Sequence, residues 1–300
     1  MQELIFATRP SALARWQTQY IAKKLGQSWE GLVCEERVIT TKGDKVLDKP
    51  LPEIGGKGLF TYELEQSLLS GDVHAAVHSL KDLPTDHPAG LTIGAIPERG
   101  DVHDVLISPA GFTLEQLPPG AVVGTSSTRR KAQLLAHRPD LQIQPIRGNV
   151  DTRIRKAQGG QYEAIILAEA GVTRLGLEHM ITQRLPFEIM LSAPGQGALA
   201  VQCRDDDTNT LLILNGIEHT DTRKSVEAER AFLETLGGGC SLPVGAFAAV
   251  VGSEIHLQAI VVSTDGTKNI RLAGKNSNPH ELGNNLAQEA INQGAWRLIQ

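Results

Sequence analysis

The chain has 300 residues, of which 41% are hydrophobic and 21% charged, so we expect two or three folded domains and exclude a disordered chain. No apolar run approaches the roughly 20 residues that span a bilayer, and the first residues lack the apolar core of a signal peptide, so we expect a cytoplasmic protein without membrane contact. The formal net charge is −5, which opposes general binding of nucleic acid.

Strand and helix patterns alternate through roughly the first 200 residues, which predicts α/β domains with parallel strands. Ser11 is placed to cap a helix that ends near Gly26. Phe60, Leu64 and Leu68 recur at helical spacing and predict a second helix. Strands are predicted at 73–78 and 91–96.

A second unit is predicted after residues 97–100, with strands at 105–107, 121–123, 141–146 and 164–167. A turn-rich segment at 192–197 then leads to another strand at 199–203. A chain that leaves one α/β unit, builds a second and returns forms two lobes joined by two crossings. This is the plan of a hinged ligand-binding protein.

The pattern changes near residue 221, where a helix is predicted to residue 236. Strands at 244–251, 255–262 and 270–273 and a C-terminal helix follow, which predicts a small α+β domain with an antiparallel sheet. We therefore predict three domains, comprising residues 1–98 with 196–216, residues 102–192, and residues 219–300.

Cys240 is a candidate functional thiol because three glycines precede it, and such a backbone can present a side chain rather than bury it. The alternative is a small buried cysteine in a loop, the usual place of a free thiol. Cys34 and Cys203 lie in apolar runs and are expected in the core. The cysteines form no CxxC pair, and none has metal-ligand spacing to a histidine, so we expect reduced thiols and no metal.

The segment from His78 to Pro84 follows a predicted strand, where open α/β sheets bind ligands. Lys81 and Asp82 are adjacent there, so one could bind an anion while the other handles a proton or a cation. The alternative is a surface ion pair and a helix cap.

Three further segments place basic side chains at a helix start after a strand: 125–130, 147–153 and 169–174. The stretch from residue 129 to residue 156 contains eight Lys and Arg residues but only two Asp residues. Hydroxyls, backbone N–H groups and arginine forks at a helix start bind anions. The alternative for each is solvated charge on a helix face, but their recurrence predicts a ligand with several negative charges.

Taken together, the motifs resemble the porphobilinogen deaminase (hydroxymethylbilane synthase) family over essentially the whole chain. The resemblance lies in seven segments in the family's order: 7–14, 54–60, 76–84, 124–130, 147–149, 193–199 and 238–241. It implies two hinged α/β lobes like those of type II periplasmic binding proteins, plus a small α+β C-terminal domain that anchors the cofactor.

The resemblance also implies a function: stepwise condensation of four porphobilinogen molecules onto a covalent dipyrromethane primer, with release of ammonia and then of the linear tetrapyrrole hydroxymethylbilane by hydrolysis, by a monomer. Cys240 would carry the primer through a thioether, and Asp82 would be the catalytic aspartate. Because each pyrrole ring bears an acetate and a propionate, the other matching residues would bind carboxylates or donate hydrogen bonds: Arg9, Ser11, Lys57, Ser79, Lys81, Thr125, Ser126, Ser127, Arg129, Arg130, Arg147, Gly148, Arg153, Arg174 and Gln196.

The polar segment 41–58 has no helical or strand period and resembles the family's mobile lid, with Lys57 reaching inward. Its glycines do not match a phosphate-binding motif. A second hypothesis is a two-lobed anion-binding protein without enzyme activity, which would need neither Cys240 nor Asp82. Binding of nucleic acid is the weakest hypothesis, because no aromatic residue lies between residues 129 and 156.

Overall fold

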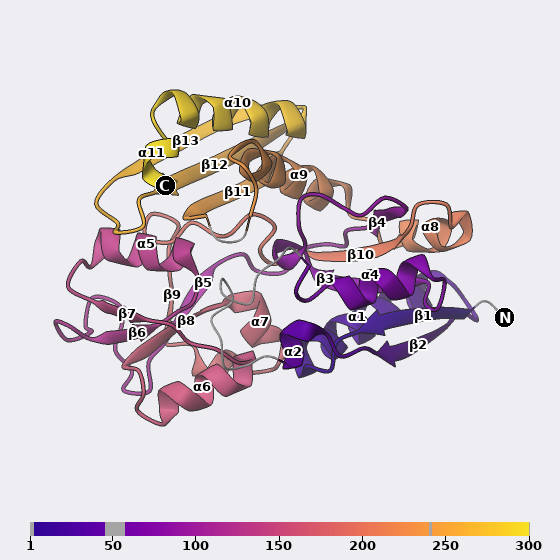
Figure 1. Cartoon of the computed structure of the whole chain (residues 1–300), viewed down its shortest axis with the longest axis horizontal. Helices are drawn as coiled ribbons and strands as arrows, with labels where there is room; N and C mark the ends of the chain where they lie inside the picture. Colours follow the sequence, from indigo (N-terminus) through magenta and orange to yellow (C-terminus); the bar gives the residue numbers. More distant parts are fainter. Residues whose placement is uncertain (1–2, 46–57, 240–241, 300) are drawn as a thin grey trace. The chain divides into compact units, whose positions relative to one another are not determined.

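The first sheet is built around the N-terminal strand of the chain. The computed structural model describes residues 3–45, 58–239 and 242–299. Five strands form this mixed sheet in the order β2-β1-β3-β10-β4 (Figure 1). Their bounds are β1 Glu3–Thr8, β2 Val33–Val38, β3 Ala75–Ser79, β4 Leu91–Ala95 and β10 Leu199–Arg204. The associated helices are α1 Ala12–Ser28, α2 Lys42–Lys45, α4 Tyr62–Leu69, the one-turn η1 Leu80–Asp82 and α8 Thr208–Asn215.

The second sheet repeats this plan in the order β7-β6-β8-β5-β9. Its strands are β5 Asp104–Ile107, β6 Val122–Gly124, β7 Gln142–Gln144, β8 Ala164–Ala168 and β9 Gln183–Arg184. Its helices are α5 Thr128–His137, α6 Val150–Gln158, α7 Glu169–Arg174 and the one-turn η2 Glu178–Met180.

Both α/β sheets contain the predicted parallel strands, and each also contains an antiparallel strand that the sequence did not indicate. β10 runs antiparallel to β3 and β4, and β5 runs antiparallel to β8. Each of these strands follows or precedes the long excursion of the chain between the two sheets, so no helical crossover forces it to be parallel. The two sheets share one strand order. This confirms the predicted fold class, which is two α/β lobes like those of type II periplasmic binding proteins.

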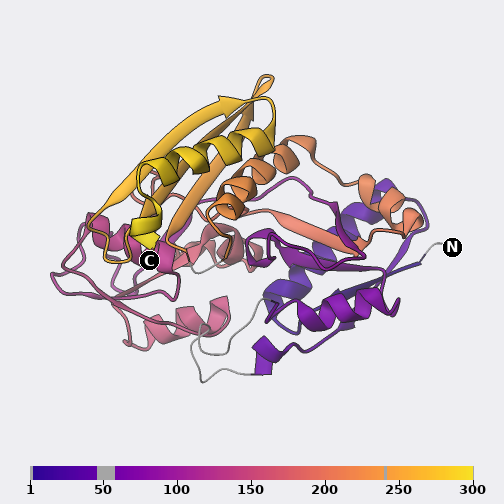
Figure 2. The same ribbon diagram turned by 45° about the horizontal axis from the view of Figure 1, so that its top comes forward.

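The third sheet is antiparallel, as predicted, and has the order β11-β12-β13. Its strands are β11 Val244–Val251, β12 Glu254–Val262 and β13 Asn269–Asn276. The helices α9 Thr220–Thr235, α10 Pro279–Asn292 and α11 Trp296–Ile299 accompany it. Figure 2 shows the C-terminal helix α10 lying along this sheet. Phe232 of α9 and Leu286 of α10 share a core with the sheet's buried residues.

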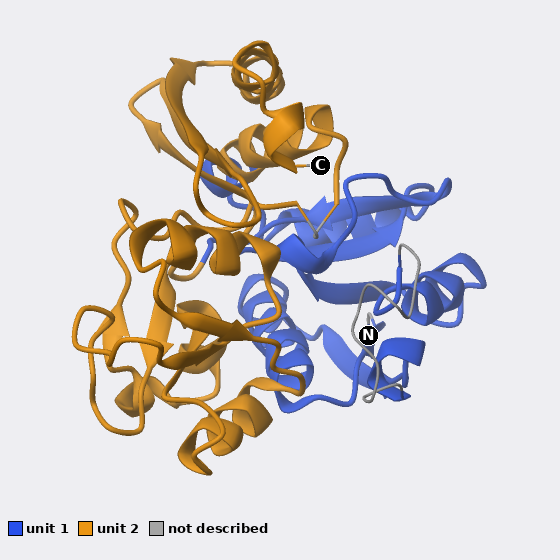
Figure 3. Ribbon diagram, turned by 60° about the vertical axis from the view of Figure 1, so that its left-hand side comes forward, with its two compact units in different colours: residues 1–99, 198–223 blue, residues 100–197, 224–300 orange. Residues whose placement is uncertain are grey.

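The chain divides into two compact units, each made of two separate segments (Figure 3). Unit 1 comprises residues 1–99 and 198–223, and unit 2 comprises residues 100–197 and 224–300. Unit 2 therefore holds both the second and the third sheet. The boundaries of the three predicted domains stay a prediction.

Local signals placed most elements correctly. Ser11 caps α1 by accepting a hydrogen bond from the Ala14 N–H at 3.2 Å, but the helix runs two residues past Gly26. Phe60 was expected in the second helix and instead precedes it; its ring lies against Gly43, where a Cβ would be 2.2 Å from Phe60 Cε1. Among the described helices, none is long and apolar enough to cross a membrane.

Candidate active site

The first group of predicted site residues lies at one edge of the first sheet. β1 and β3 are parallel, so their carboxyl ends meet at the same edge. Arg9 and Ser11 follow β1, whereas Ser79, Lys81 and Asp82 end or follow β3. The topology thus places at one edge five predicted site residues from two segments that lie 68 or more positions apart in the sequence.

Arg9 is held from two sides. Its Nε and Nη2 donate to the two oxygens of Asp44, and its guanidinium lies 4.2 Å from the centre of the Phe60 ring. Burial alone would raise the pKa of Asp44, but hydrogen bonds from Arg9 and Thr41 outweigh burial and lower it. Among the described residues, Arg9 Nη1 makes no hydrogen bond, so this nitrogen is the donor left for a ligand.

Asp82 ends the single turn η1, and its side chain is exposed. Within the described part of the chain, Asp82 makes no hydrogen bond or ion pair. A surface ion pair or a helix cap, the alternative role, would require one. The neighbouring side chains are more constrained, since Gln17 Nε2 donates to Ser79 Oγ at 2.8 Å. Asp82 is thus the acidic group at this edge that is available to a ligand.

The second group lies at one edge of the second sheet. β6 is parallel to both β7 and β8, so the three strands end at the same edge. The predicted anion segments follow these strands in turn and start helices α5, α6 and α7. This confirms that the three segments share one edge, the geometry on which the prediction of a polyanionic ligand depends.

The hydroxyl residues after β6 have local roles. Ser127 caps α5 by accepting from the Arg130 N–H at 3.4 Å. Ser126 Oγ donates to the Ile146 carbonyl at 2.8 Å and accepts from the Ile146 N–H at 3.0 Å, which joins the ends of β6 and β7. Thr125 Oγ1 accepts from the Ser127 N–H at 3.2 Å. These bonds fix the turn in which the predicted ligand donors lie.

Arg129 and Arg130 are buried against Asp104, a residue that the sequence analysis did not select. Arg129 Nη1 donates to Asp104 Oδ2 at 2.7 Å, and Arg130 donates to Oδ1 from Nε at 2.9 Å and from Nη2 at 2.7 Å. Gln196 Nε2 also reaches Asp104 Oδ1, at 3.1 Å. Three predicted ligand-binding residues therefore converge on one carboxylate.

After β7, Gly148 takes a φ of +113°, a backbone conformation that glycine adopts readily. Its carbonyl accepts from Arg153 Nε at 2.7 Å, while the Arg147 carbonyl accepts from Lys156 Nζ at 3.1 Å. Asn149 occupies the N-cap position of α6, where asparagine commonly caps a helix, but its side chain makes no cap hydrogen bond.

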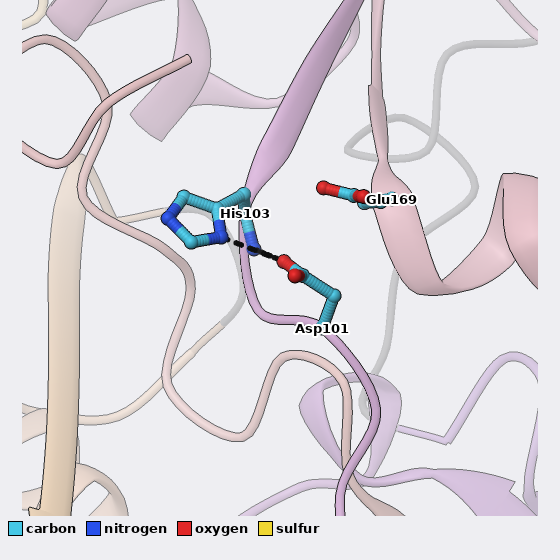
Figure 4. A group of neighbouring side chains, drawn as sticks. All are labelled: Asp101, His103 and Glu169. Carbon is cyan, nitrogen blue, oxygen red and sulfur yellow. Dashed lines mark hydrogen bonds and ion pairs between the residues drawn. The ribbon is translucent and has the colours of Figure 1, made fainter. Parts of the chain in front are cut away.

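Arg174, at the end of α7, donates from Nη2 to the Gly197 carbonyl at 2.7 Å. Glu169, at the start of the same helix, forms a group with Asp101 and His103 whose ligand atoms lie within 4.8 Å of one another (Figure 4). Arg184 pairs with both carboxylates, so the chain itself supplies the positive charge at this group. The group therefore gives no argument for a metal ion.

Two predicted residues, Lys57 and Cys240, lie outside the described residues, as does most of the predicted lid. Conversely, sequence reasoning missed Asp44, which binds Arg9, and Asp104, which binds Arg129 and Arg130. The signal that could have found Asp104 is a carboxylate at the start of an otherwise apolar strand, since a buried charge needs a partner.

The fold and the two edges define an α/β protein with cationic and hydroxyl donors at the carboxyl ends of its parallel strands. Two family models match the chain: "Porphobilinogen deaminase, dipyromethane cofactor binding domain" over residues 4–211 and "Porphobilinogen deaminase, C-terminal domain" over residues 224–292. The chain belongs to the porphobilinogen deaminase family, which confirms the resemblance and the prediction of an enzyme with a dipyrromethane cofactor.

Curated relatives match almost end to end. A porphobilinogen deaminase of Desulforamulus reducens is 46% identical over 99% of this chain and 97% of its own length. One from Brevibacillus brevis is 50% identical over 97% of this chain and 95% of its own. One from Geobacillus kaustophilus is 44% identical over the whole of this chain and 97% of its own.

The donors at the second edge fit a cofactor that bears several carboxylates. Arginines follow each of the three strands, and arginine pairs with carboxylates through charge-assisted hydrogen bonds. Gly148, which follows β7, has no room for a side chain, because a Cβ would lie 2.7 Å from Thr152 Cγ2. The residues present therefore suit a polyanionic pyrrole chain.

Proposed function

We propose that the chain condenses four porphobilinogen molecules stepwise onto a dipyrromethane primer, releases ammonia at each step, and frees the linear tetrapyrrole hydroxymethylbilane by hydrolysis. The observation that supports this most is the convergence of three arginine-bearing strand ends at one sheet edge in a member of this family. We propose further that the protein acts as a monomer in the cytoplasm, with porphobilinogen as its small-molecule substrate and without nucleic acid.

Cys240 is the residue that we assign to covalent attachment of the primer. The primer, when bound, supplies the nucleophilic pyrrole carbon to which substrate rings are added. The chain's own part is to hold its carboxylates, a role we assign to Arg129, Arg130, Arg147, Arg153 and Arg174 in unit 2. Each such arginine–carboxylate bond contributes roughly 1.5–3 kcal/mol.

Asp82 is the residue that we assign to proton transfer and charge stabilisation. As the aminomethyl group of porphobilinogen leaves as ammonia, positive charge develops and is shared with the pyrrole nitrogen. A carboxylate beside that nitrogen stabilises this charge and can accept or return a proton. The exposed Asp82 side chain at the ligand edge of the first sheet supports this role. Lys81, Arg9, Ser11 and Ser79 are proposed to bind the substrate near Asp82, and Lys57 to close over it.

The attachment is tested by intact mass spectrometry of the purified protein. The parent protein should be heavier than its sequence by two linked pyrrole units, and Cys240→Ala should have the mass of its sequence alone. Addition of porphobilinogen should then add ring-sized increments to the parent only. An active parent preparation with the bare sequence mass would reject the primer.

The role of Asp82 is tested separately with Asp82→Ala. Because Asp82 is exposed and makes no hydrogen bond or ion pair with the described residues, the variant should unfold at the same temperature as the parent. Loss of general acid–base catalysis should reduce ammonia release by about 100-fold or more. Near-normal ammonia release would remove Asp82 from the mechanism.

A further inference from the structure

Asp104 begins β5 and is completely enclosed, with 0% of its surface exposed. It pairs across the antiparallel ladder with Ala168, the last residue of β8. Its carboxylate therefore lies at the same edge of the sheet as the ends of β6, β7 and β8. A charge this deeply buried is stable only with good partners, and Asp104 has two guanidinium groups.

Asp104 neutralises one of the two positive charges that converge on it. Arg129 and Arg130 are 4% and 7% exposed, and burial lowers the pKa of Arg129, an effect that the charge of Asp104 opposes. The group of three side chains thus keeps one net positive charge. That charge is available to an anionic ligand at the edge of the sheet.

The hydrogen bonds within the protein also determine which N–H groups of Arg129 and Arg130 remain available to a ligand. Arg129 uses Nη1 for both Asp104 and the Leu191 carbonyl, each at 2.7 Å. Within the described residues, its Nε and Nη2 make no hydrogen bond. Arg130 is anchored on its far side, because Nη1 donates to the Ile166 carbonyl at 3.0 Å. The Nη1 atom of Arg129 is thereby bound by protein acceptors, whereas its Nε and Nη2 atoms stay available to a ligand.

We propose that Asp104 is a positioning residue that orients Arg129 and Arg130 toward the carboxylates of the primer and the growing pyrrole chain. The proposal rests on the function proposed above. Asp104 does not itself touch the ligand. It acts by restricting the two guanidinium groups to one geometry, which reduces the entropy lost when they bind a carboxylate.

The test is Asp104→Asn, which keeps the shape of the side chain but removes its charge and one acceptor. Two quantities are measured on the folded fraction: the share of molecules that carry the primer, by intact mass, and KM against kcat for porphobilinogen. We expect primer occupancy to fall below half that of the parent, and KM to rise about tenfold with kcat changed much less.

Two matched variants separate positioning from stability. Leu106→Ala lies two residues along the same strand, is buried, and destabilises the sheet without removing a charge or a side-chain hydrogen-bond acceptor. Asp140→Asn removes a carboxylate from an exposed arginine pair, with Arg138, in the same unit. Both should keep full occupancy and a normal KM. If Asp104→Asn also does so, Asp104 supports only the fold and the proposal is wrong.

If Asp104→Asn does not fold, Asp104→Glu decides, because it keeps the charge and displaces it by one methylene. Reduced occupancy in folded Asp104→Glu supports positioning, whereas normal occupancy, or failure of both variants to fold, overturns it. A parent protein without the primer mass would instead contradict the proposed function, and intact mass reports this before any variant is made.

Discussion

His78, next to the proposed catalytic turn, illustrates how a single buried side chain couples the site to pH. His78 Nε2 lies 3.1 Å from Gln202 Oε1, and Gln202 Nε2 donates to Glu65 Oε1 at 3.4 Å. Burial lowers the pKa of His78 to about 4, and the positive charge of Arg9 acts in the same direction. The imidazole is therefore neutral in the folded protein at neutral pH.

This shift predicts a loss of stability in mild acid. Between pH 6.5 and 4 the unfolded chain binds a proton at this histidine that the folded protein does not, so the free energy of unfolding falls as the pH falls. From pH 6.5 to 4.5 the loss should be about 2 kcal/mol, and His78→Gln should lack it. Urea unfolding at several pH values measures the difference.

His137→Asn is the matched control, because His137 is exposed and lies 3.8 Å from Glu115 at the surface. It should unfold with the pH profile of the parent. Carboxyl groups with lowered pKa, such as Asp44 and Asp101, destabilise the fold only at lower pH, so they do not mimic the effect. Identical pH profiles for His78→Gln and the parent would contradict the assignment.

Residue-scale chemistry was only partly predictable. Asp82, Lys81 and the arginines after β6, β7 and β8 were found from motif and strand position, which are local. Asp104 lies 25 and 26 residues from its arginine partners, and Asp44 lies 35 residues from Arg9. Those pairs form only when strands from different parts of the chain become neighbours, so composition and spacing do not reveal them.

At the scale of elements, the β12–β13 hairpin shows how the third sheet is joined to the second. Gly266 in its turn has a φ of +77°, and a Cβ there would lie 2.5 Å from the Ala136 N of α5. Ala132 of α5 and Leu191 pack with Ile260 and Val262 of β12 beside it. The turn is therefore pressed directly against a helix backbone.

Gly266→Ala should therefore destabilise the protein by about 3 kcal/mol, through both backbone strain and the clash with α5. Gly252→Ala is the matched control, since Gly252 also has a positive φ, +64°, but nothing lies within 4 Å of its Cβ position. This control should lose only about 1 kcal/mol. The midpoints of urea unfolding measure both, and equal losses would show that the contact with α5 contributes nothing.

Element-scale expectations succeeded where the signal was periodic and failed where a tertiary contact competed. The first two strands of the last sheet were found close to their true bounds, whereas the third, predicted at 270–273, spans Asn269–Asn276. Asn149 and Ser127 both stand at N-cap positions, yet only Ser127 accepts a cap hydrogen bond. The Gly148 carbonyl beside Asn149 accepts from Arg153 Nε, a contact that the sequence alone does not indicate.

At the scale of the whole molecule, the chain makes each compact unit from two separate segments. In unit 2 the buried Glu229 of α9 accepts from the Gly195 N–H at 2.7 Å and from the Ala248 N–H at 2.8 Å. One carboxylate thus joins the return segment before β10 to the first strand of the third sheet. The predicted return of the chain to its first sheet is confirmed by the pairing of β10 with β3 and β4.

The sequence by itself determined the family, the dipyrromethane cofactor and the order of most helices and strands, because motifs and hydrophobic periodicity are properties of neighbouring residues. Only the tertiary structure decided that both α/β sheets carry an antiparallel strand, and that Arg129, Arg130 and Gln196 converge on Asp104. The physical reason is burial: a carboxylate fully removed from water requires partners in space, and the folded arrangement of strands alone selects them.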